Sequence, residues 1–381
     1  MEIKRTTNNR KDFQKKIEQA LAKKPTASFI QSKGITPENL QKIVGLPSNI
    51  IPNKKMKYYN ANRNNQAVFF QSPEPPAEPL DRPTRFLSTL IKNDNVTTLE
   101  LPDRGAFNAG LIAFQDKYIC VYRSSEYQFR ACFLDKNLKV DQNSLFTFEF
   151  SNCADPRLIW SPDGKKLITV FSSTDEGFHY EFIRGCVLMD LDKSDQFINT
   201  EPFRISPKDL GTRQKNWMPF VLDNRIFLTG SVCPHIVYEF KFGESEHWCD
   251  KISEFKWHNP WMYKAFLRGN TNAVRLDDGN FLGTFHTAMR NISTYYYDNG
   301  AYLFEGKPPF RVLKCSNKTY LKAEDAIYPH FRKRGEILVN FPVGLVKENN
   351  NLLISYGDND SCVKILKTTV DEVLSTMVDV Y

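Results

Sequence analysis

The stretch "ADPRLIWSPDGKKLITVFSS", residues 154–173, holds two short apolar runs separated by a Pro-Asp-Gly turn. A polar residue, an apolar run, a turn and a second apolar run together predict an antiparallel β-hairpin. Asp155 and Arg157 stand at the start of the first run. A buried charge there is costly unless it is paired or takes part in a functional site. We expect an extended backbone here, in which Pro156 keeps Asp155 out of the helical region and Asp155 and Arg157 project to the same side.

The same pattern recurs along the second part of the chain. Its other instances are residues 107–123, 216–232, 270–286 and 341–360. Turn-forming residues lie in the middle of every instance: Gln115-Asp116, Pro162-Asp163-Gly164, Asp223-Asn224, Asp277-Asp278-Gly279 and Asn349-Asn350. Further apolar runs such as "CVLMDLD" and "HIVYEFKF" lie between the hairpins. Five hairpins, each followed by a second strand pair, predict an all-β, five-bladed β-propeller, because radial repetition protects the strand edges. A β-sandwich is the structural alternative, but it does not explain the polar residue that heads each hairpin.

The first 95 residues have a different pattern. Residues 10–24 carry apolar side chains four apart on a charged background, and residues 36–45 begin with Thr-Pro and end with Gly, so both predict short helices. Residues 71–83 contain five prolines and cannot join the centre of a sheet. We therefore predict an N-terminal, partly helical, Pro-rich extension over residues 1–95 and the five-bladed propeller over residues 96–381. The extension either packs on the propeller or makes a contact such as homo-oligomerisation.

Composition excludes several classes of protein. The chain of 381 residues has 51 Lys and Arg against 44 Asp and Glu, a net charge of +7, and no dense basic block, so we expect no nucleic-acid partner. It has no apolar 18-residue stretch and no signal-like start, which predicts no membrane span. The eight cysteines are scattered singly, as is typical of reduced thiols in a cytoplasmic protein. No CxxC or HExxH pattern points to a metal.

The polar residues of the five hairpins are expected to meet. In an antiparallel hairpin the start of the first strand and the end of the second lie at one edge. The starts carry Asn108, Asp155, Asn216 and Asn270-Thr271, and the ends carry Arg123, Ser172-Ser173, Ser231, His286 and residues 356–360. If these hairpins are the inner strands of the blades, the groups line one mouth of the central channel, the default place for a site.

Several of these motifs resemble one family. These motifs are "ADPR" at 154–157, "KNWMPF" at 215–220, "PH" at 234–235, "RGNT" at 268–271, "FH" at 285–286 and "ISYGDNDS" at 354–361. They are similar to motifs of the five-bladed propeller enzymes of glycoside hydrolase family 130, which are the β-mannoside phosphorylases and their hydrolytic relatives. They also resemble the related β-1,2-mannosyltransferases and phosphorylases of glycosyltransferase family 108. The likeness covers roughly residues 105–370.

The resemblance implies roles for individual residues. Asp155 would be the proton donor to the glycosidic oxygen, Asn108 would contact the donor sugar although Ala109 replaces the family's proline, and Asp360 would bind sugar hydroxyls. The remaining predicted substrate-binding residues are the basic groups Arg123, Arg157, Lys215, His235, Arg268 and His286, which would hold phosphate, the polar groups Asn216 and Thr271, and the sugar-stacking aromatics Trp217 and Tyr356. No cofactor is implied, only inorganic phosphate or a sugar phosphate as co-substrate.

The chemistry of these residue types favours phosphate over water as the attacking group. Inverting phosphorolysis needs one proton donor and an anion clamp, whereas hydrolysis needs a second carboxylate that holds a water. The predicted mouth is rich in Arg, Lys and His. We therefore expect an inverting enzyme that phosphorolyses β-mannosides or makes them from mannose 1-phosphate. A mannosyltransferase that uses a nucleotide sugar is the first alternative, since it needs the same clamp. A non-catalytic propeller that binds glycans or proteins is the second.

Overall fold

The computed structural model describes residues 58–60, 67–69, 95–103, 105–124, 127–174, 180–207, 214–242, 247–261, 267–290, 294–322, 330–332 and 335–380. The chain divides into two compact units, Met1–Pro79 and Leu80–Tyr381. In the first unit, β1 (Tyr58–Asn60) pairs antiparallel with β2 (Ala67–Phe69). The two predicted helices and the Pro-rich run lie outside the described residues. The division at residue 95 stays a prediction.

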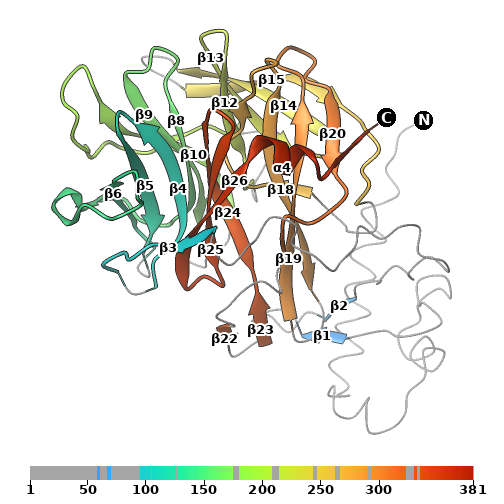
Figure 1. Ribbon diagram of the computed structural model, residues 1–381, viewed down its shortest axis with the longest axis horizontal. Helices are drawn as coiled ribbons and strands as arrows, with labels where there is room; N and C mark the ends of the chain where they lie inside the picture. Colours follow the sequence, from blue (N-terminus) through green and yellow to red (C-terminus); the bar gives the residue numbers. More distant parts are fainter. Residues whose placement is uncertain are drawn as a thin grey trace, which may run out of the picture. The chain divides into compact units, whose positions relative to one another are not determined.

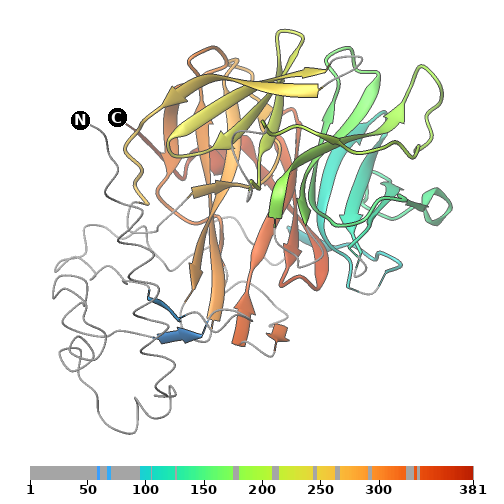
Figure 2. The same ribbon diagram turned by 180° about the vertical axis from the view of Figure 1, so that it is seen from behind.

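The second unit is built from five sheets, antiparallel apart from one parallel pairing in the fourth, which confirms the predicted five-bladed propeller and removes the sandwich alternative (Figures 1 and 2). The first blade has the strands β4 (Phe107–Phe114), β5 (Lys117–Arg123), β6 (Phe129–Leu134) and β7 (Phe146–Thr147). The second has β8 (Cys153–Trp160), β9 (Lys166–Thr174), β10 (Tyr180–Asp190) and β11 (Phe203–Arg204). The third has β12 (Met218–Leu222), β13 (Arg225–Ser231), β14 (His235–Phe242) and β15 (His247–Phe255).

The fourth blade is larger than the others. Its central strands are β16 (Leu267–Gly269), β17 (Val274–Arg275), β18 (Phe281–Arg290), β19 (Thr294–Phe304) and β20 (Val312–Ser316). The short strands β21 (Leu321–Lys322), β22 (His330–Arg332) and β23 (Gly335–Leu338) extend it into a nine-stranded sheet together with a strand from the chain's end.

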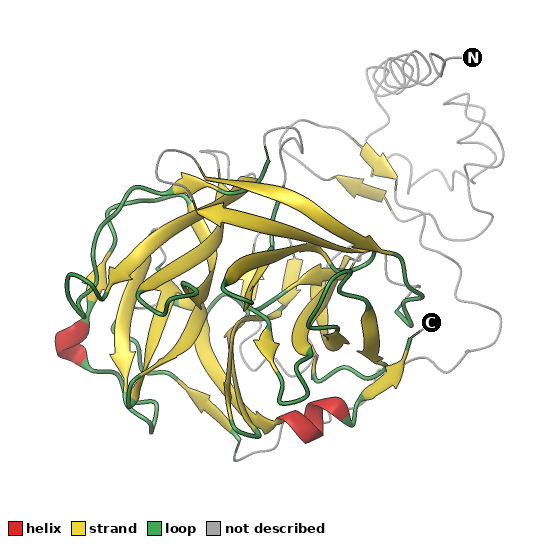
Figure 3. Ribbon diagram, turned by 90° about the horizontal axis from the view of Figure 1, so that it is seen from above, coloured by secondary structure: helices red, strands yellow, loops and turns green. Residues whose placement is uncertain are grey.

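The fifth blade joins the two ends of the unit. It contains β24 (Asn340–Glu348), β25 (Asn351–Asp358) and β26 (Cys362–Thr369), and its fourth strand is β3 (Val96–Thr98), which pairs with β26. After β26 come α4 (Val370–Leu374) and β27 (Met377–Asp379), which pairs with β20 of the fourth blade. Apart from α4, the described residues contain one short 3-10 helix, η2 (Gln142–Ser144) (Figure 3). In this part of the chain no helix combines the length and hydrophobicity needed to cross a bilayer.

The turns of the inner hairpins have the backbone that their sequences predict. Gln115, Asp223, Asn224 and Asn349 have positive φ angles between 47° and 58°, and Gly164 and Gly279 have φ of 72° and 86°. Asn, Asp and Gly are the residues that reach this left-handed region at least cost. Turns of this kind match the twist of the flanking strands, so the local sequence sets where each hairpin reverses.

Apolar side chains fill the spaces between neighbouring sheets. The first and second blades share a cluster that includes Phe129 and Phe171, whose ring centroids lie 5.3 Å apart with nearly perpendicular planes. The fourth and fifth blades share another, which includes Leu303 and Leu352. The sheets pack face to face around the ring, and their inner strands lie close together.

Glycines permit this close approach. A Cβ atom at Gly110 of β4 would overlap the backbone oxygen of Pro156 in β8, and one at Gly344 of β24 would overlap the backbone nitrogen of Leu111 in β4. Backbone atoms of a central strand cannot rotate aside as a side chain can.

We therefore expect Gly110→Ala to lower the free energy of unfolding by about 2–3 kcal/mol, the upper range for overpacking a buried contact. Urea denaturation of the full chain measures this difference. Gly164→Ala is the control, because a methyl group there has open space and only the strain of its positive φ to bear. An unchanged stability in Gly110→Ala would show that the two blades can separate freely.

Candidate active site

Asn108, Asp155 and Asn216 occupy equivalent positions at the start of the inner strands of three blades. All three have a left-handed backbone, with φ of 52°, 61° and 63°. The pairing of β4 with β5 skips between Phe107 and Gly110, and that of β8 with β9 skips between Ala154 and Arg157. The extended backbone expected at Asp155 is therefore wrong, because a β-bulge interrupts the strand there. Asn and Asp tolerate this conformation better than other side-chain-bearing residues.

The bulges bring side chains of neighbouring blades into contact. The Nδ2 atom of Asn108 donates a hydrogen bond of 2.9 Å to Oδ1 of Asp155. Both residues are buried, and Asp155 is only 4% exposed. The Asn108 amide therefore orients the Asp155 carboxyl group and occupies one of its two oxygens.

Arg157 links three inner strands. Its side chain is fully buried, and its guanidinium donates through Nη1 to the backbone oxygen of Asp155 at 2.8 Å and through Nη2 to Oδ1 of Asn216 at 3.3 Å. Its Nε donates to the backbone oxygen of Asn270, which follows β16. We call Asn108, Asp155, Arg157, Asn216 and Asn270 the axial cluster. Much of the guanidinium's hydrogen-bonding capacity is used within the protein, so Arg157 holds the cluster together.

Two more cations lie close to the axial cluster. Burial and the positive charge of Arg268 lower the pKa of Lys215 to about 8, Asp155 opposes the shift, and Arg157 adds to it. Burial and the charges of Lys215, Arg268 and Arg157 lower the pKa of His286 well below its usual value. His286 lies beside Arg268 in the strand register and contacts the cluster, with 2.7 Å between its Nδ1 and Oδ1 of Asn270. Lys215 directly precedes Asn216, Arg268 pairs with His286, and Arg157 bonds Asp155 and Asn216, so these basic groups gather beside the axial cluster.

Arg123 and the end of β25 flank this volume. Arg123 pairs with Phe107 across the first hairpin and places its guanidinium 3.9 Å from the ring centroid of Tyr127. In the "YGDND" run, Asp358 is fully buried and bonds Lys364 at 2.6 Å, whereas Asp360 is partly exposed in the following turn. Tyr356 is buried and packs in the apolar cluster between the fourth and fifth blades.

Three predicted residues point elsewhere. His235 is fully buried inside the third and fourth blades, where it contacts the backbone oxygen of Phe310 at 2.8 Å, and burial lowers its pKa to about 4. Trp217 packs on Tyr238, with 4.5 Å between ring centroids. Thr271 bonds the backbone oxygen of Asn272 at 2.7 Å. The structure does not bring these three side chains to the axial cluster.

Asn299 and the Asp358–Lys364 pair were not predicted from the sequence. Asn299 contacts the axial cluster through Asn270, at 3.1 Å. Asn299 lies in the second strand pair of its blade. The prediction used only residues at the ends of the inner hairpins, so it could not find Asn299. The alternation of charge in "GDNDSCVK" could have indicated the buried pair, because Asp358 and Lys364 flank a tight turn.

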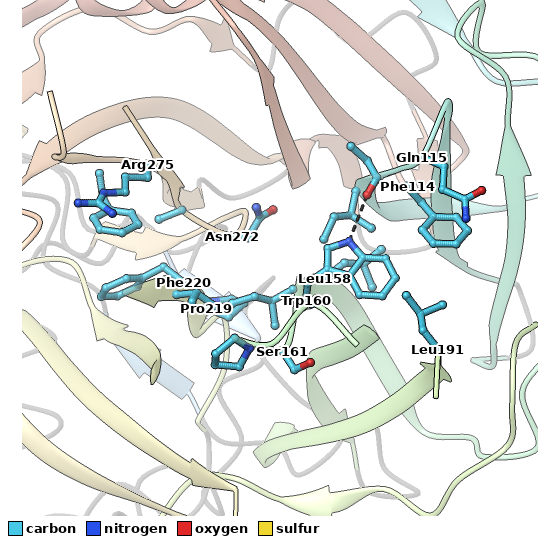
Figure 4. Close-up of a pocket in the computed structure, with 18 residues that line it drawn as sticks. Phe114, Gln115, Leu158, Trp160, Ser161, Leu191, Pro219, Phe220, Asn272 and Arg275 are labelled. Carbon is cyan, nitrogen blue, oxygen red and sulfur yellow. Dashed lines mark hydrogen bonds between the residues drawn. The ribbon is translucent and has the colours of Figure 1, made fainter. Parts of the chain in front are cut away.

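A cavity of about 550 Å³ lies at the other end of the inner strands. Figure 4 shows Phe114 and Trp160 on one side of it and Arg275 on the other, with Asn272 between them. Trp160 stacks on Phe114 at 5.5 Å and donates from Nε1 to the backbone oxygen of Ala113. None of the predicted site residues lines this cavity, so it is distinct from the axial cluster.

The fold and the axial cluster together define a five-bladed propeller in which the buried carboxyl group of Asp155 lies beside Arg157 at the start of the inner strands. A family model described as beta-1,4-mannooligosaccharide phosphorylase, that of glycoside hydrolase family 130, matches residues 139–379. The chain belongs to this family. No match was found among curated proteins.

Solved structures support the same fold. A putative glycoside hydrolase from Bacteroides ovatus ATCC 8483 is 13% identical, with a TM-score of 0.52, and the match covers 75% of this chain and 95% of that one. A putative glycosidase from Bacteroides thetaiotaomicron VPI-5482 is also 13% identical, with a TM-score of 0.52 and coverage of 76% and 95%. A putative glycoside hydrolase from Parabacteroides distasonis ATCC 8503 is 12% identical, with a TM-score of 0.50 and coverage of 69% and 86%.

Proposed function

We propose that this chain phosphorolyses β-mannosides with inversion and that Asp155 is the proton donor. An oxygen of inorganic phosphate attacks C1 of the mannosyl group, and the bond from C1 to the glycosidic oxygen breaks. The Asp155 carboxyl group gives its proton to the departing oxygen. The products are α-mannose 1-phosphate and a sugar with a free hydroxyl group, and Asp155 is left as a carboxylate.

The observation that carries this proposal is the crowding of Lys215, Arg268 and Arg157 around one carboxyl group. Cations that lower the pKa of a neighbouring lysine repel one another, and a bound dianion would relieve that repulsion. Phosphate is such a dianion and is already nucleophilic, so the reaction needs no carboxylate base. The family model, named for a phosphorylase, agrees with this choice.

Unused polar atoms at the same end of the inner hairpins fit a sugar ligand. The atoms Oδ1 of Asn108, Nε of Arg123, Oγ of Ser173 and Oγ1 of Thr287 are buried and have no hydrogen-bond partner among the described residues. Buried polar atoms are normally paired, so these are suited to pair with ligand hydroxyls.

Hydrolysis is less compatible with these residues. It would need a second carboxylate that activates a water. The buried carboxylate of Asp358 at the same end of the fifth blade is paired with Lys364 at 2.6 Å. The Lys364 ammonium already occupies this carboxylate, whereas phosphate needs no base, so phosphate remains the better attacking group.

Product analysis tests the proposal. The enzyme is incubated with β-1,2- and β-1,4-linked mannobiose, with and without inorganic phosphate, and mannose 1-phosphate is measured. In the reverse direction, mannose 1-phosphate and GDP-mannose are offered separately with mannose as acceptor. We expect phosphate-dependent release of mannose 1-phosphate and synthesis from mannose 1-phosphate alone. Synthesis from GDP-mannose alone would instead identify a transferase, and glycan binding without turnover would identify a lectin.

The pKa of Lys215 predicts a pH dependence. Only the protonated ammonium attracts phosphate, so kcat/KM for phosphate should fall as the pH rises through about 8. Lys215→Arg should remove this decline, because arginine keeps its charge. Phosphate's own ionisation affects both enzymes equally, so comparing the two profiles isolates the lysine. Identical profiles would exclude Lys215 from the anion site.

A further inference from the structure

His286 lies at the end of a relay of side-chain amides that determines which of its ring nitrogens carries the proton. The relay begins at Asn299, whose Nδ2 donates to the backbone oxygens of Leu321 at 2.8 Å and Asn340 at 2.9 Å. Carbonyl oxygens only accept hydrogen bonds. The NH2 group of Asn299 must therefore face them, and its Oδ1 faces Asn270.

The orientation of the Asn299 amide fixes the orientation of the Asn270 amide. Its Nδ2 donates to Oδ1 of Asn299 at 3.1 Å, so its own Oδ1 faces Nδ1 of His286 at 2.7 Å. Because this oxygen accepts, Nδ1 of His286 carries the hydrogen. In a neutral imidazole the other nitrogen, Nε2, is then a bare acceptor.

The surroundings keep the imidazole neutral and immobile. Burial and the nearby cations Lys215, Arg268 and Arg157 disfavour the imidazolium form. The ring packs against Tyr297 and Phe341, with centroid distances of 4.4 Å and 5.1 Å. Nε2 is fully buried and has no hydrogen-bond partner among the described residues. A fixed acceptor thus stands within a set of positive charges.

We propose that Nε2 of His286 accepts the hydrogen of the P–OH group of bound hydrogenphosphate and makes the site select phosphate over sulfate. This inference rests on the proposed function. The cations attract any tetrahedral dianion equally well. Hydrogenphosphate carries one hydroxyl group at neutral pH, whereas sulfate carries none. Bound sulfate would place an oxygen lone pair against the lone pair of Nε2, which is repulsive. Hydrogenphosphate instead donates its P–OH hydrogen to Nε2 and turns its unprotonated oxygens toward the cations.

Anion binding to the whole chain tests the proposal directly. Isothermal titration calorimetry compares inorganic phosphate with sulfate, and arsenate with selenate as a second pair that differs in the hydroxyl group. We expect the hydroxyl-bearing anion to bind about tenfold to a hundredfold more tightly in each pair, the effect of leaving one buried acceptor unpaired.

Two variants change the acceptor in different ways. Asn270→Asp places a carboxylate against Nδ1, which favours the imidazolium form and turns Nε2 into a donor. Sulfate should then gain affinity and the preference for phosphate should shrink, because both anions can offer an unprotonated oxygen to the new donor. His286→Asn can keep the bond to Asn270 but removes Nε2, so the two affinities should become equal. Thermal unfolding checks both variants, and His286→Asn carries the test if Asn270→Asp does not fold.

The outcomes separate this inference from the proposed function. Equal affinity for phosphate and sulfate in the unaltered enzyme overturns the inference, even if mannosides are phosphorolysed. An unchanged preference in the folded variants also overturns it. Selection of phosphate without any turnover of mannosides supports the inference and removes the proposed function. Failure to bind any of the four anions removes both.

Discussion

Replacing Asp155 with asparagine should lower the rate of β-mannobiose phosphorolysis about a hundredfold to ten-thousandfold, the usual range for loss of a general acid. The amide oxygen of the new residue can still accept the hydrogen bond from Asn108, which is 2.9 Å long in the structure. Asparagine also tolerates the left-handed backbone found here, with φ of 61°. The fold and the binding of phosphate should therefore survive, and only proton donation should be lost.

The leaving group provides a sharper measurement. A 4-nitrophenyl β-mannoside departs as a stable phenolate and needs no proton, so Asp155→Asn should retain far more activity on it than on mannobiose. Steady-state rates on both substrates, with circular dichroism as the check of folding, test the assignment. An equal loss on both substrates would show that Asp155 acts in binding and not as the acid.

Arg157→Met should lower the free energy of unfolding by about 3–5 kcal/mol, as expected when one partner of a buried charged network is removed. The change leaves three buried acceptors without their donor: the backbone oxygens of Asp155 and Asn270 and Oδ1 of Asn216. Arg157→Lys should recover only part of the loss, because one ammonium cannot replace the three directions of a guanidinium.

Urea denaturation measures this effect, with Arg311→Ala as the matched control. Arg311 bonds Glu305 at 2.7 Å, but its side chain is 55% exposed. The Glu305 side chain is only 10% exposed, but Arg311 itself reaches solvent, so this variant should lose only about 1 kcal/mol, well below the loss at Arg157. Similar stabilities for Arg157→Met and Arg311→Ala would mean that the axial cluster does not depend on Arg157.

The propeller was predictable because each hairpin carries its own signal. An apolar run, a turn with Asn, Asp or Gly, and a second apolar run occur within about twenty residues, and they recur five times. The convergence of Asn108, Asp155 and Asn216 followed from their shared place at the head of a hairpin. The fourth strand of the last blade was not predictable in this way, because β3 is separated from β26 by the whole propeller.

The internal arrangement of the site depends on features that local sequence does not express. The bulge at Asp155 arises where two blades meet, and an isolated "ADPR" run reads as extended. Arginine is a residue type that often binds anions, yet the guanidinium of Arg157 bonds protein atoms of three blades. In the sequence, His235 and His286 both stand at an end of an apolar run. Their hydrogen-bond partners from elsewhere in the chain distinguish them: His235 contacts Phe310 in the interior, and His286 contacts Asn270 of the axial cluster.

The pairing of β3 with β26 has a consequence for how the polypeptide is made. The ribosome makes Cys362–Thr369 on the order of ten seconds or more after Val96–Thr98, because more than two hundred residues lie between them. Throughout this interval the edge of β3 has no native neighbour, and the nascent chain must keep it from pairing with other strands. Ring closure is thus a long-range event that must wait for the last blade, and we expect a slow final phase in refolding.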